Sequence, residues 1–136
     1  MATWKRQRAV FNRQDSAELR ELGFASLFLN RTNRSGILAG GVIGGKEQSG
    51  EWTLDVRFNK PDLIERIKKV KRYADRIRLY NLDAATLTTD VIPTIPNAFV
   101  FYDPPYIDIQ RELYFNPYSL DDHKKLGEKV ERLSQP

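Results

Sequence analysis

The sequence predicts an α/β fold with a parallel sheet, and three observations lead to that prediction. Residues 98–102 form a continuous apolar run that stops at two prolines, as expected of a strand buried on both faces of a parallel sheet. Apolar residues recur at helical spacing before and after this run. The resulting order of helix, strand, linker, strand and helix is typical of α/β proteins, which bind ligands at the carboxyl ends of their strands.

The N-terminal half contains a predicted helix followed by a glycine-rich segment. An acceptor side chain followed by a carboxylate at residues 15–18 predicts a helix start, and Gly23 is expected to break that helix. The short apolar run at residues 24–29 fits either a continued helix or a strand. Residues 30–50 are rich in glycine and predict a loop or hairpin, whereas residues 52–58 alternate like a half-buried strand.

The C-terminal half gives clearer element signals. Pro61 fits the first turn of a helix, and apolar residues continue that helix towards Ala74. Residues 77–80 are predicted to form a strand that ends in a turn at residues 81–83. A capping-box pattern that begins at Ser119 predicts a final helix reaching about Leu133.

Composition limits the classes of protein that the chain can belong to. The 136 residues suit one domain, and the net charge of +4 includes nine Lys or Arg against three Asp or Glu at residues 57–78. Such a basic stretch is either a solvated helix face or a surface for a polyanion. The absence of cysteine excludes disulfides and Cys-based zinc sites, and a lone His123 argues against a His-based metal site. Without a membrane-length apolar run or a signal-peptide pattern, a cytoplasmic location is expected.

The sharpest chemical signal is Asp103-Pro104-Pro105-Tyr106, directly after the predicted buried strand. An exocyclic amine is a poor nucleophile because its lone pair is delocalised into the ring. The Asp103 carboxylate and the Pro104 carbonyl could each accept one N–H, which directs the lone pair towards a methyl donor and lowers the barrier electrostatically. The Tyr106 ring could stack on an extruded base. The alternative reading is an ordinary turn that ends a strand.

Several segments resemble one known family. The string from Phe101 to Tyr106 is similar to the catalytic motif of the Dam-like, D12-class adenine-N6 DNA methyltransferases. Residues 28–37 resemble the family's "LNRT…G" segment, and residues 41–45 and 55–60 match a branch of the family. The similarity covers roughly residues 24–133, with the motifs in the family's order.

This resemblance implies a partial Rossmann-like methyltransferase sheet with a glycine-rich hairpin inserted for DNA recognition. The chain would be a single partial methyltransferase domain over residues 1–136. Residues 24–60 would form the DNA-recognition hairpin region, and residues 61–136 the catalytic α/β part. The implied localisation is the cytoplasm of a bacterial or archaeal cell, or of a phage-infected one.

The resemblance also implies roles for individual residues. The target adenine would be bound and activated by Asp103, Pro104, Pro105 and Tyr106. DNA would be contacted by Asn30, Arg31, Asn33 and Arg34, whose chemistry suits phosphates and base edges. Asp83 would approach the adenine of S-adenosyl-L-methionine (AdoMet), although an aspartate there is also a common turn or helix-cap residue. Three further aromatic residues are candidates to line the base pocket or to pack the loop after the motif: Tyr114, Phe115 and Tyr118.

Two departures from the family pattern shape the functional expectation. The sequence contains no Gly-x-Gly loop of the kind that holds the methionine portion of AdoMet, and Ala84 stands where the family often has an aromatic residue. We therefore expect a truncated or split adenine-N6 DNA methyltransferase, or an excised fragment of one. It would be inactive alone and would be partnered by a complementing N-terminal segment or by a second copy. The alternatives are a non-catalytic nucleic-acid-binding remnant and a structural α/β domain with an incidental motif.

Overall fold

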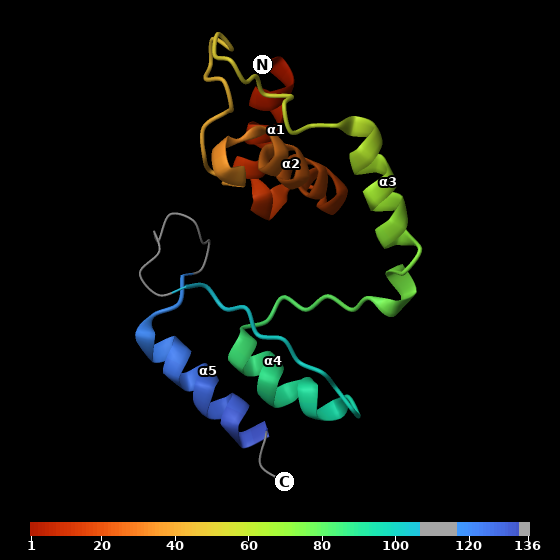
Figure 1. Ribbon diagram of the computed structural model, residues 1–136, viewed down its shortest axis with the longest axis vertical. Coiled ribbons are helices and arrows are strands. Elements are labelled where there is room, and N and C mark those ends of the chain that lie inside the picture. Colours follow the sequence, from red (N-terminus) through yellow and green to blue (C-terminus); the bar gives the residue numbers. More distant parts are fainter. Residues whose placement is uncertain (107–116, 134–136) are drawn as a thin grey trace. The chain divides into compact units, whose positions relative to one another are not determined.

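The computed structural model describes residues 1–106 and 117–133, and the chain divides into two compact units, Met1–Arg76 and Ile77–Pro136. Regular structure in the described residues is helical (Figure 1). Their single β feature is an isolated antiparallel bridge between Asn33 and Val42. The first unit ends after Arg76, whereas the sequence-based division into hairpin region and catalytic part was placed after residue 60.

The predicted α/β fold, with its partial Rossmann-like sheet, is therefore wrong. Residues 77–80 and 98–102 carry the expected apolar side chains but form no strand. Leu79 is 92% exposed and Phe99 is 93% exposed, so neither side chain makes the packing contacts that would stabilise a strand. Strand preference depends mainly on cross-strand packing and burial, and an apolar run without a partner strand does not express it.

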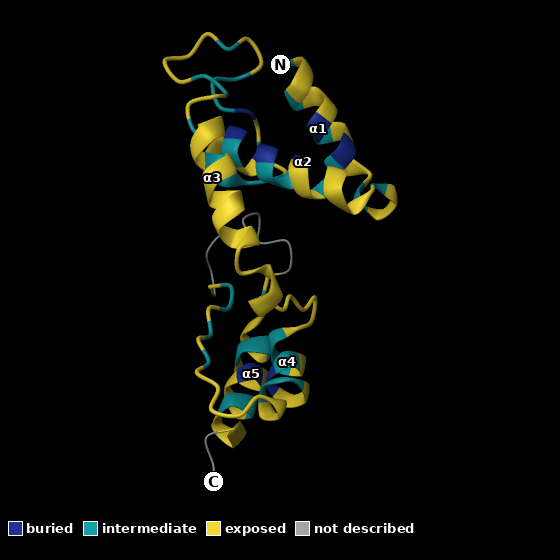
Figure 2. Cartoon of the chain, turned by 90° about the vertical axis from the view of Figure 1, so that its right-hand side faces the viewer, coloured by how far each residue is buried: buried dark blue, intermediate teal, exposed yellow. Residues whose placement is uncertain are grey.

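The first unit is built on a pair of packed helices, α1 (Ala2–Asn12) and α2 (Leu19–Thr32). Both helices carry buried residues, which are dark blue in Figure 2. Short 3-10 turns follow each helix, η1 (Gln14–Ser16) after α1 and η2 (Arg34–Gly36) after α2. The core residues of this unit are Val10, Ala25, Phe28, Leu29 and Val42.

The sequence signals for these two helices were only partly correct. Helix α1 was not predicted, because its exposed face is polar and basic. Helix α2 starts after Glu18, whose carboxylate accepts the N–H of Glu21 at 3.2 Å. The predicted break at Gly23 does not occur, because the burial of Ala25, Phe28 and Leu29 stabilises the helix beyond it.

The glycine-rich segment after α2 forms a series of turns, so the predicted hairpin reduces to the single bridge from Asn33. Gly44 adopts a φ of +79°, and a Cβ atom there would lie 2.6 Å from the carbonyl oxygen of Trp52. The predicted strand at 52–58 is also wrong, because successive local hydrogen bonds fold it into turns. One of these joins the Thr53 hydroxyl to the Asp55 carboxylate at 2.6 Å, a common turn-forming contact.

Helix α3 (Lys60–Lys71) confirms the helix predicted from Pro61, and the turn η3 (Ala74–Arg76) follows it. The side chain of Asn59 caps α3 by accepting the N–H of Asp62 at 3.2 Å. None of the residues of α3 is buried, and Ile67 and Val70 remain more than half exposed. Its apolar face borders a groove beside α2 instead of a closed core.

The second unit pairs α4 (Ala84–Asp90) with α5 (Leu120–Leu133), and the turn η4 (Ile92–Thr94) follows α4. Helix α5 confirms the predicted capping box, because Ser119 and Asp122 exchange hydrogen bonds at its start. Helix α4 was not predicted. Among the described residues of this unit, Thr88 and Leu126 are buried. No helix among the described ranges is both long and apolar enough to cross a bilayer.

Candidate functional site

The motif Asp103-Pro104-Pro105 lies on the wall of a cavity of about 240 Å³ within the second unit. Most of the other walls are apolar and come from α4, α5 and the segment before the motif. Prolines have no backbone N–H, so this part of the wall offers carbonyl and carboxylate oxygens without competing donors. Residues of the motif and of its neighbours in space line this cavity together, among them Ala84, Tyr102, Asp103, Pro104, Pro105 and Tyr118.

Tyr102 joins the motif to α4 through a partly buried pair of hydroxyl groups. The hydroxyl of Thr88 donates to the carbonyl of Ala84 at 2.7 Å, so its remaining capacity is to accept. The hydroxyl of Tyr102 lies 3.0 Å away and supplies the donor. Because Tyr102 directly precedes Asp103, this contact helps to position the backbone of Asp103 at the cavity wall.

Asp83 is the N-cap of α4, and both of its carboxylate oxygens are engaged within the chain. One oxygen accepts the N–H of Ala85 at 2.8 Å, and the other accepts the hydroxyl of Tyr118 at 2.6 Å. The bond from Tyr118 is the largest cause that lowers the pKa of Asp83. Burial, followed by the bond to Asp83, raises the pKa of Tyr118.

The motif thus gives the cavity wall hydrogen-bond acceptors, and none of the described residues that border it is a Lys or Arg. Such a site suits a neutral group with N–H donors, for example an aromatic amine, better than an anion. Tyr106, the last residue of the motif, is not among the residues that line the cavity; it is 62% exposed, so its ring is accessible. Of the three aromatic candidates, Tyr118 lines the cavity, while Tyr114 and Phe115 lie outside the described residues.

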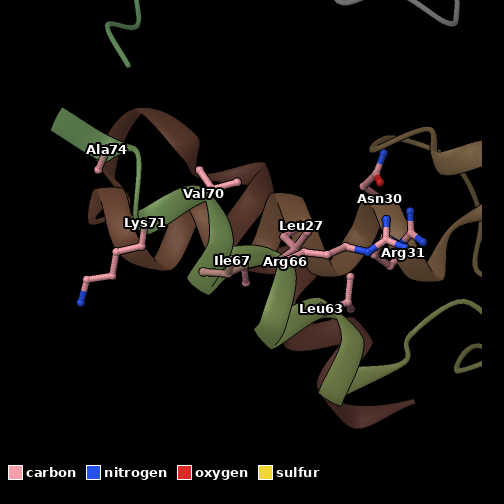
Figure 3. Close-up of a pocket in the computed structure, with 9 residues that line it drawn as sticks. All are labelled: Leu27, Asn30, Arg31, Leu63, Arg66, Ile67, Val70, Lys71 and Ala74. Carbon is pink, nitrogen blue, oxygen red and sulfur yellow. The ribbon is translucent and has the colours of Figure 1, made fainter. Parts of the chain in front are cut away.

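Asn30 and Arg31 occupy the last turns of α2, beside a groove of about 650 Å³ that α3 borders on its other side (Figure 3). The floor is apolar, and Arg66 extends along the groove towards the end where Arg31 lies. Two reciprocal contacts hold the neighbouring segment to α2. Arg31 donates to the carbonyl of Arg57 at 3.3 Å, and Arg57 donates to the carbonyl of Asn30 at 2.7 Å.

Asn33 and Arg34 have contrasting environments although they are neighbours. Asn33 is fully buried, and its amide group accepts the indole N–H of Trp4 at 2.7 Å and donates to the carbonyls of Ile37 and Leu38. Arg34 is exposed, and its guanidinium makes no hydrogen bond or ion pair with the described residues. Arg34 is therefore free to meet a ligand, whereas the amide of Asn33 is used to shape the loop.

The loop is also held from α1, by residues that sequence reasoning did not single out. Arg8 donates to the carbonyls of Leu38 at 2.6 Å and Ala39 at 3.0 Å, and it also bonds to the carbonyl of Gly40. Its guanidinium lies 5.1 Å from the ring centroid of Trp4. The i, i+4 spacing of Trp4 and Arg8 places them on one helix face, a signal that becomes visible once α1 is known to be helical.

An acceptor-rich cavity and an exposed basic surface are the two parts that a DNA base-modifying protein needs. A model of the D12 class N6 adenine-specific DNA methyltransferase family matches residues 3–134, and the chain belongs to that family. Members of this family use AdoMet as the methyl donor. No curated protein and no solved structure matches the chain.

The described residues do not by themselves fit AdoMet. The oxygens of Asp83 are already bonded to Ala85 and Tyr118, so an incoming adenine would have to displace one of those partners. Ala84 on the cavity wall offers a methyl group in place of a ring that could stack on the cofactor's adenine. A complete donor site requires either a rearranged Asp83 or residues from another segment.

Proposed function

We propose that this chain is the base-binding and DNA-contacting part of a site-specific adenine-N6 DNA methyltransferase, and that it is inactive alone. The observation that carries the proposal is the acceptor turn of Asp103 and Pro104 on the wall of an apolar cavity, in a chain of this family. The cavity gives a flipped base an apolar surface, and the turn gives its amino group two acceptors.

The chain's own contribution to the reaction is to hold and orient the amine. The Asp103 carboxylate accepts one N–H of the adenine amino group, and the Pro104 carbonyl accepts the other. The nitrogen then moves towards tetrahedral geometry, and its lone pair leaves the plane of the ring. Fixed acceptors stabilise the positive charge that develops on nitrogen, and the Tyr106 ring stacks on the extruded base.

DNA contact is assigned to Asn30, Arg31 and Arg34, with Asn33 shaping the loop from inside. Support comes from the exposed, unpaired guanidinium of Arg34 and from Arg31 at the groove beside α2. Arginine pairs with phosphates and guanine edges, and asparagine reads adenine edges. Binding should weaken steeply as salt rises.

The methyl-donor site is completed by a second segment, either a complementing N-terminal piece of a methyltransferase or another copy of this chain. The absence of a Gly-x-Gly loop in the sequence and the occupied carboxylate of Asp83 support this assignment. Exposed Leu79, Phe99 and Phe101 provide apolar surface that such a segment would cover. We place the assembled protein in the cytoplasm.

The alternative function is a nucleic-acid-binding remnant without catalysis. The same occupied carboxylate of Asp83 favours it, because a chain that had lost its cofactor could keep Asp83 as a helix cap alone. The two functions share DNA binding and differ in whether methyl transfer can be restored.

A transfer assay separates the two functions. Calorimetry should detect no tight AdoMet binding by the chain alone, and tritiated-methyl transfer to adenine-containing DNA should be near background. Addition of an N-terminal segment from a related methyltransferase should restore transfer, and Asp103→Ala should abolish it while DNA binding persists. Asp90→Ala, an exposed carboxylate at the end of α4, is the matched control. Robust turnover by the 136 residues alone would contradict the proposal.

A further inference from the structure

A second basic cavity, of about 360 Å³, lies between α1 and α2 and contains none of the DNA-contacting residues assigned above. Three exposed arginines border it, Arg6, Arg13 and Arg20. Among the described residues, a single carboxylate, that of Glu21, lines it as well. Positive charge therefore exceeds negative charge at its opening.

Helical spacing explains how these arginines meet. Arg6, Val10 and Arg13 are separated by four and then three residues, so they lie along one stripe of α1 and its C-cap. Arg20 and Phe24 are four residues apart on the facing stripe of α2. Val10 of α1 and Phe24 of α2 thus lie beside the arginines, and the cavity has both guanidinium groups and apolar side chains on its walls.

The positive charges of these three guanidinium groups are hardly neutralised by carboxylates of the described residues. The guanidinium groups of Arg6 and Arg13 make no hydrogen bond or ion pair with residues in the described ranges. Arg20 approaches the Glu18 carboxylate at 3.8 Å, but its side chain is 92% exposed. An exposed pair of that kind is worth little and is easily exchanged for another anion.

One stripe of α2 runs from this cavity to the groove that contains Arg31. Arg20, Phe24, Leu27 and Arg31 recur at i, i+4, i+7 and i+11, so they form one stripe along α2. At 1.5 Å per residue, Arg20 and Arg31 are about 16 Å apart along the helix axis. That span is too long for a mononucleotide and equals about five steps of a DNA duplex at 3.4 Å per step.

We infer that the cavity of Arg6, Arg13 and Arg20 is a second phosphate-binding site, which holds duplex DNA about five base pairs away from the contacts of Arg31. This inference rests on the proposed DNA binding. A small anion would need only one of the two basic sites. A polyanion with regularly spaced charges uses both, and the α2 stripe sets the distance between them.

The test compares DNA hairpins with 4- and 16-base-pair stems by fluorescence anisotropy across a salt series, with the whole chain; the shorter stem has three steps and cannot span both sites. The cavity variant carries Arg6→Gln, Arg13→Gln and Arg20→Gln. A second variant with lysine at the same three positions keeps the charge. The control removes three exposed cations elsewhere by Lys46→Gln, Lys124→Gln and Arg132→Gln. The comparison variant for the contacts proposed above is Arg31→Gln with Arg34→Gln.

On the long stem, the cavity variant should reduce the slope of log K against log salt by roughly 2 to 3, since each neutralised phosphate contributes about 0.9. Binding at low salt should fall about tenfold or more, the lysine variant should retain most of the slope, and the short stem should show little difference. A cavity variant that matches the control, while Arg31→Gln with Arg34→Gln weakens binding, would overturn this inference and leave the proposed function standing. If none of the variants bound DNA more weakly, both this inference and the proposed DNA binding would be overturned.

Discussion

Two tyrosines, Tyr102 and Tyr118, tie the acceptor cavity to α4 through single hydroxyl groups. Tyr102 donates to Thr88, and Tyr118 donates to Asp83. Each bond joins a residue of the cavity wall to α4 or to its N-cap, and the bond of Tyr102 lies directly before Asp103 in the chain. Removal of either hydroxyl should disturb the site without removing its acceptors.

The pair of Asp83 and Tyr118 should give a measurable pH signature. The pKa of Asp83 is lowered chiefly by the Tyr118 hydroxyl, so Tyr118→Phe should move it back towards the ordinary value near 3.9. Because the folded pKa is depressed, the stabilisation is present above the unfolded value and is lost as pH falls through the folded one. Carboxyl carbon NMR of the chain with and without Tyr118→Phe measures the shift. An unchanged Asp83 titration would contradict the bond.

Tyr102→Phe should destabilise the second unit, because Thr88 loses its only described donor. The expected loss is about 0.5–1.5 kcal/mol in the free energy of unfolding, the usual contribution of one hydrogen bond. Urea denaturation followed by circular dichroism measures it. Tyr80→Phe is the matched control, since Tyr80 is 48% exposed and has no described hydrogen bond. Equal effects at the two tyrosines would argue against a positioning role for Tyr102.

At the scale of elements, side chains of α1 hold the loop that follows α2 in place by hydrogen bonds. The indole of Trp4 donates to Asn33, and Arg8 bonds to three successive carbonyls of the loop. These contacts cross about 30 residues of sequence. The geometry of the loop that carries Arg34 therefore depends on the N-terminal helix of the chain.

Trp4→Phe should loosen that loop while preserving α1, because it removes one N–H donor and leaves an aromatic ring. The loop amides of Gly40 and Ile43 should exchange with deuterium faster, and the effect should be of the order of the 1–3 kcal/mol that an unpaired buried acceptor costs. Trp52→Phe is the control, because Trp52 is 60% exposed. Slower or unchanged exchange at both amides would contradict a stabilising role of Trp4 in this loop.

Element prediction succeeded where the signal was local. Helices α3 and α5 were predicted because Pro61 and the capping box at Ser119 act within one turn. Helix α1 has no side-chain cap that a sequence pattern could show. Helix α2 continues through Gly23, because its packing on α1 outweighs the low helix propensity of glycine. Such packing is set by residues far apart in sequence, which a single-sequence pattern does not reveal.

For the whole molecule, the predicted sheet failed for a similar reason. The apolar runs at 77–80 and 98–102 have strand composition, but a strand exists only with a partner. The motif Asp103-Pro104-Pro105 follows the second run and lies on a cavity wall, and the catalytic role assigned to it stays a prediction. The sequence did not indicate that α4 would border the same cavity, because α4 itself was not predicted.

The exposed apolar side chains predict concentration-dependent self-association of the isolated chain. Sedimentation velocity should show larger species as concentration rises, and Phe99→Ser with Phe101→Ser should shift the chain towards monomer. Leu19→Ser is the control, since Leu19 is 83% exposed in the first unit. A chain that stays monomeric at high concentration would show that these side chains do not drive association.

Helix α2 has a consequence for how this protein can change over evolutionary time. Ala25, Phe28, Leu29 and Thr32 pack inside the unit, while the stripe from Arg20 to Arg31 lies about a third of a turn around the same helix. Insertion or deletion of one residue within α2 would rotate everything beyond it by about 100° and misalign both faces together. Lineages of this chain should therefore vary α2 by substitution and keep its length, with length changes confined to the loops.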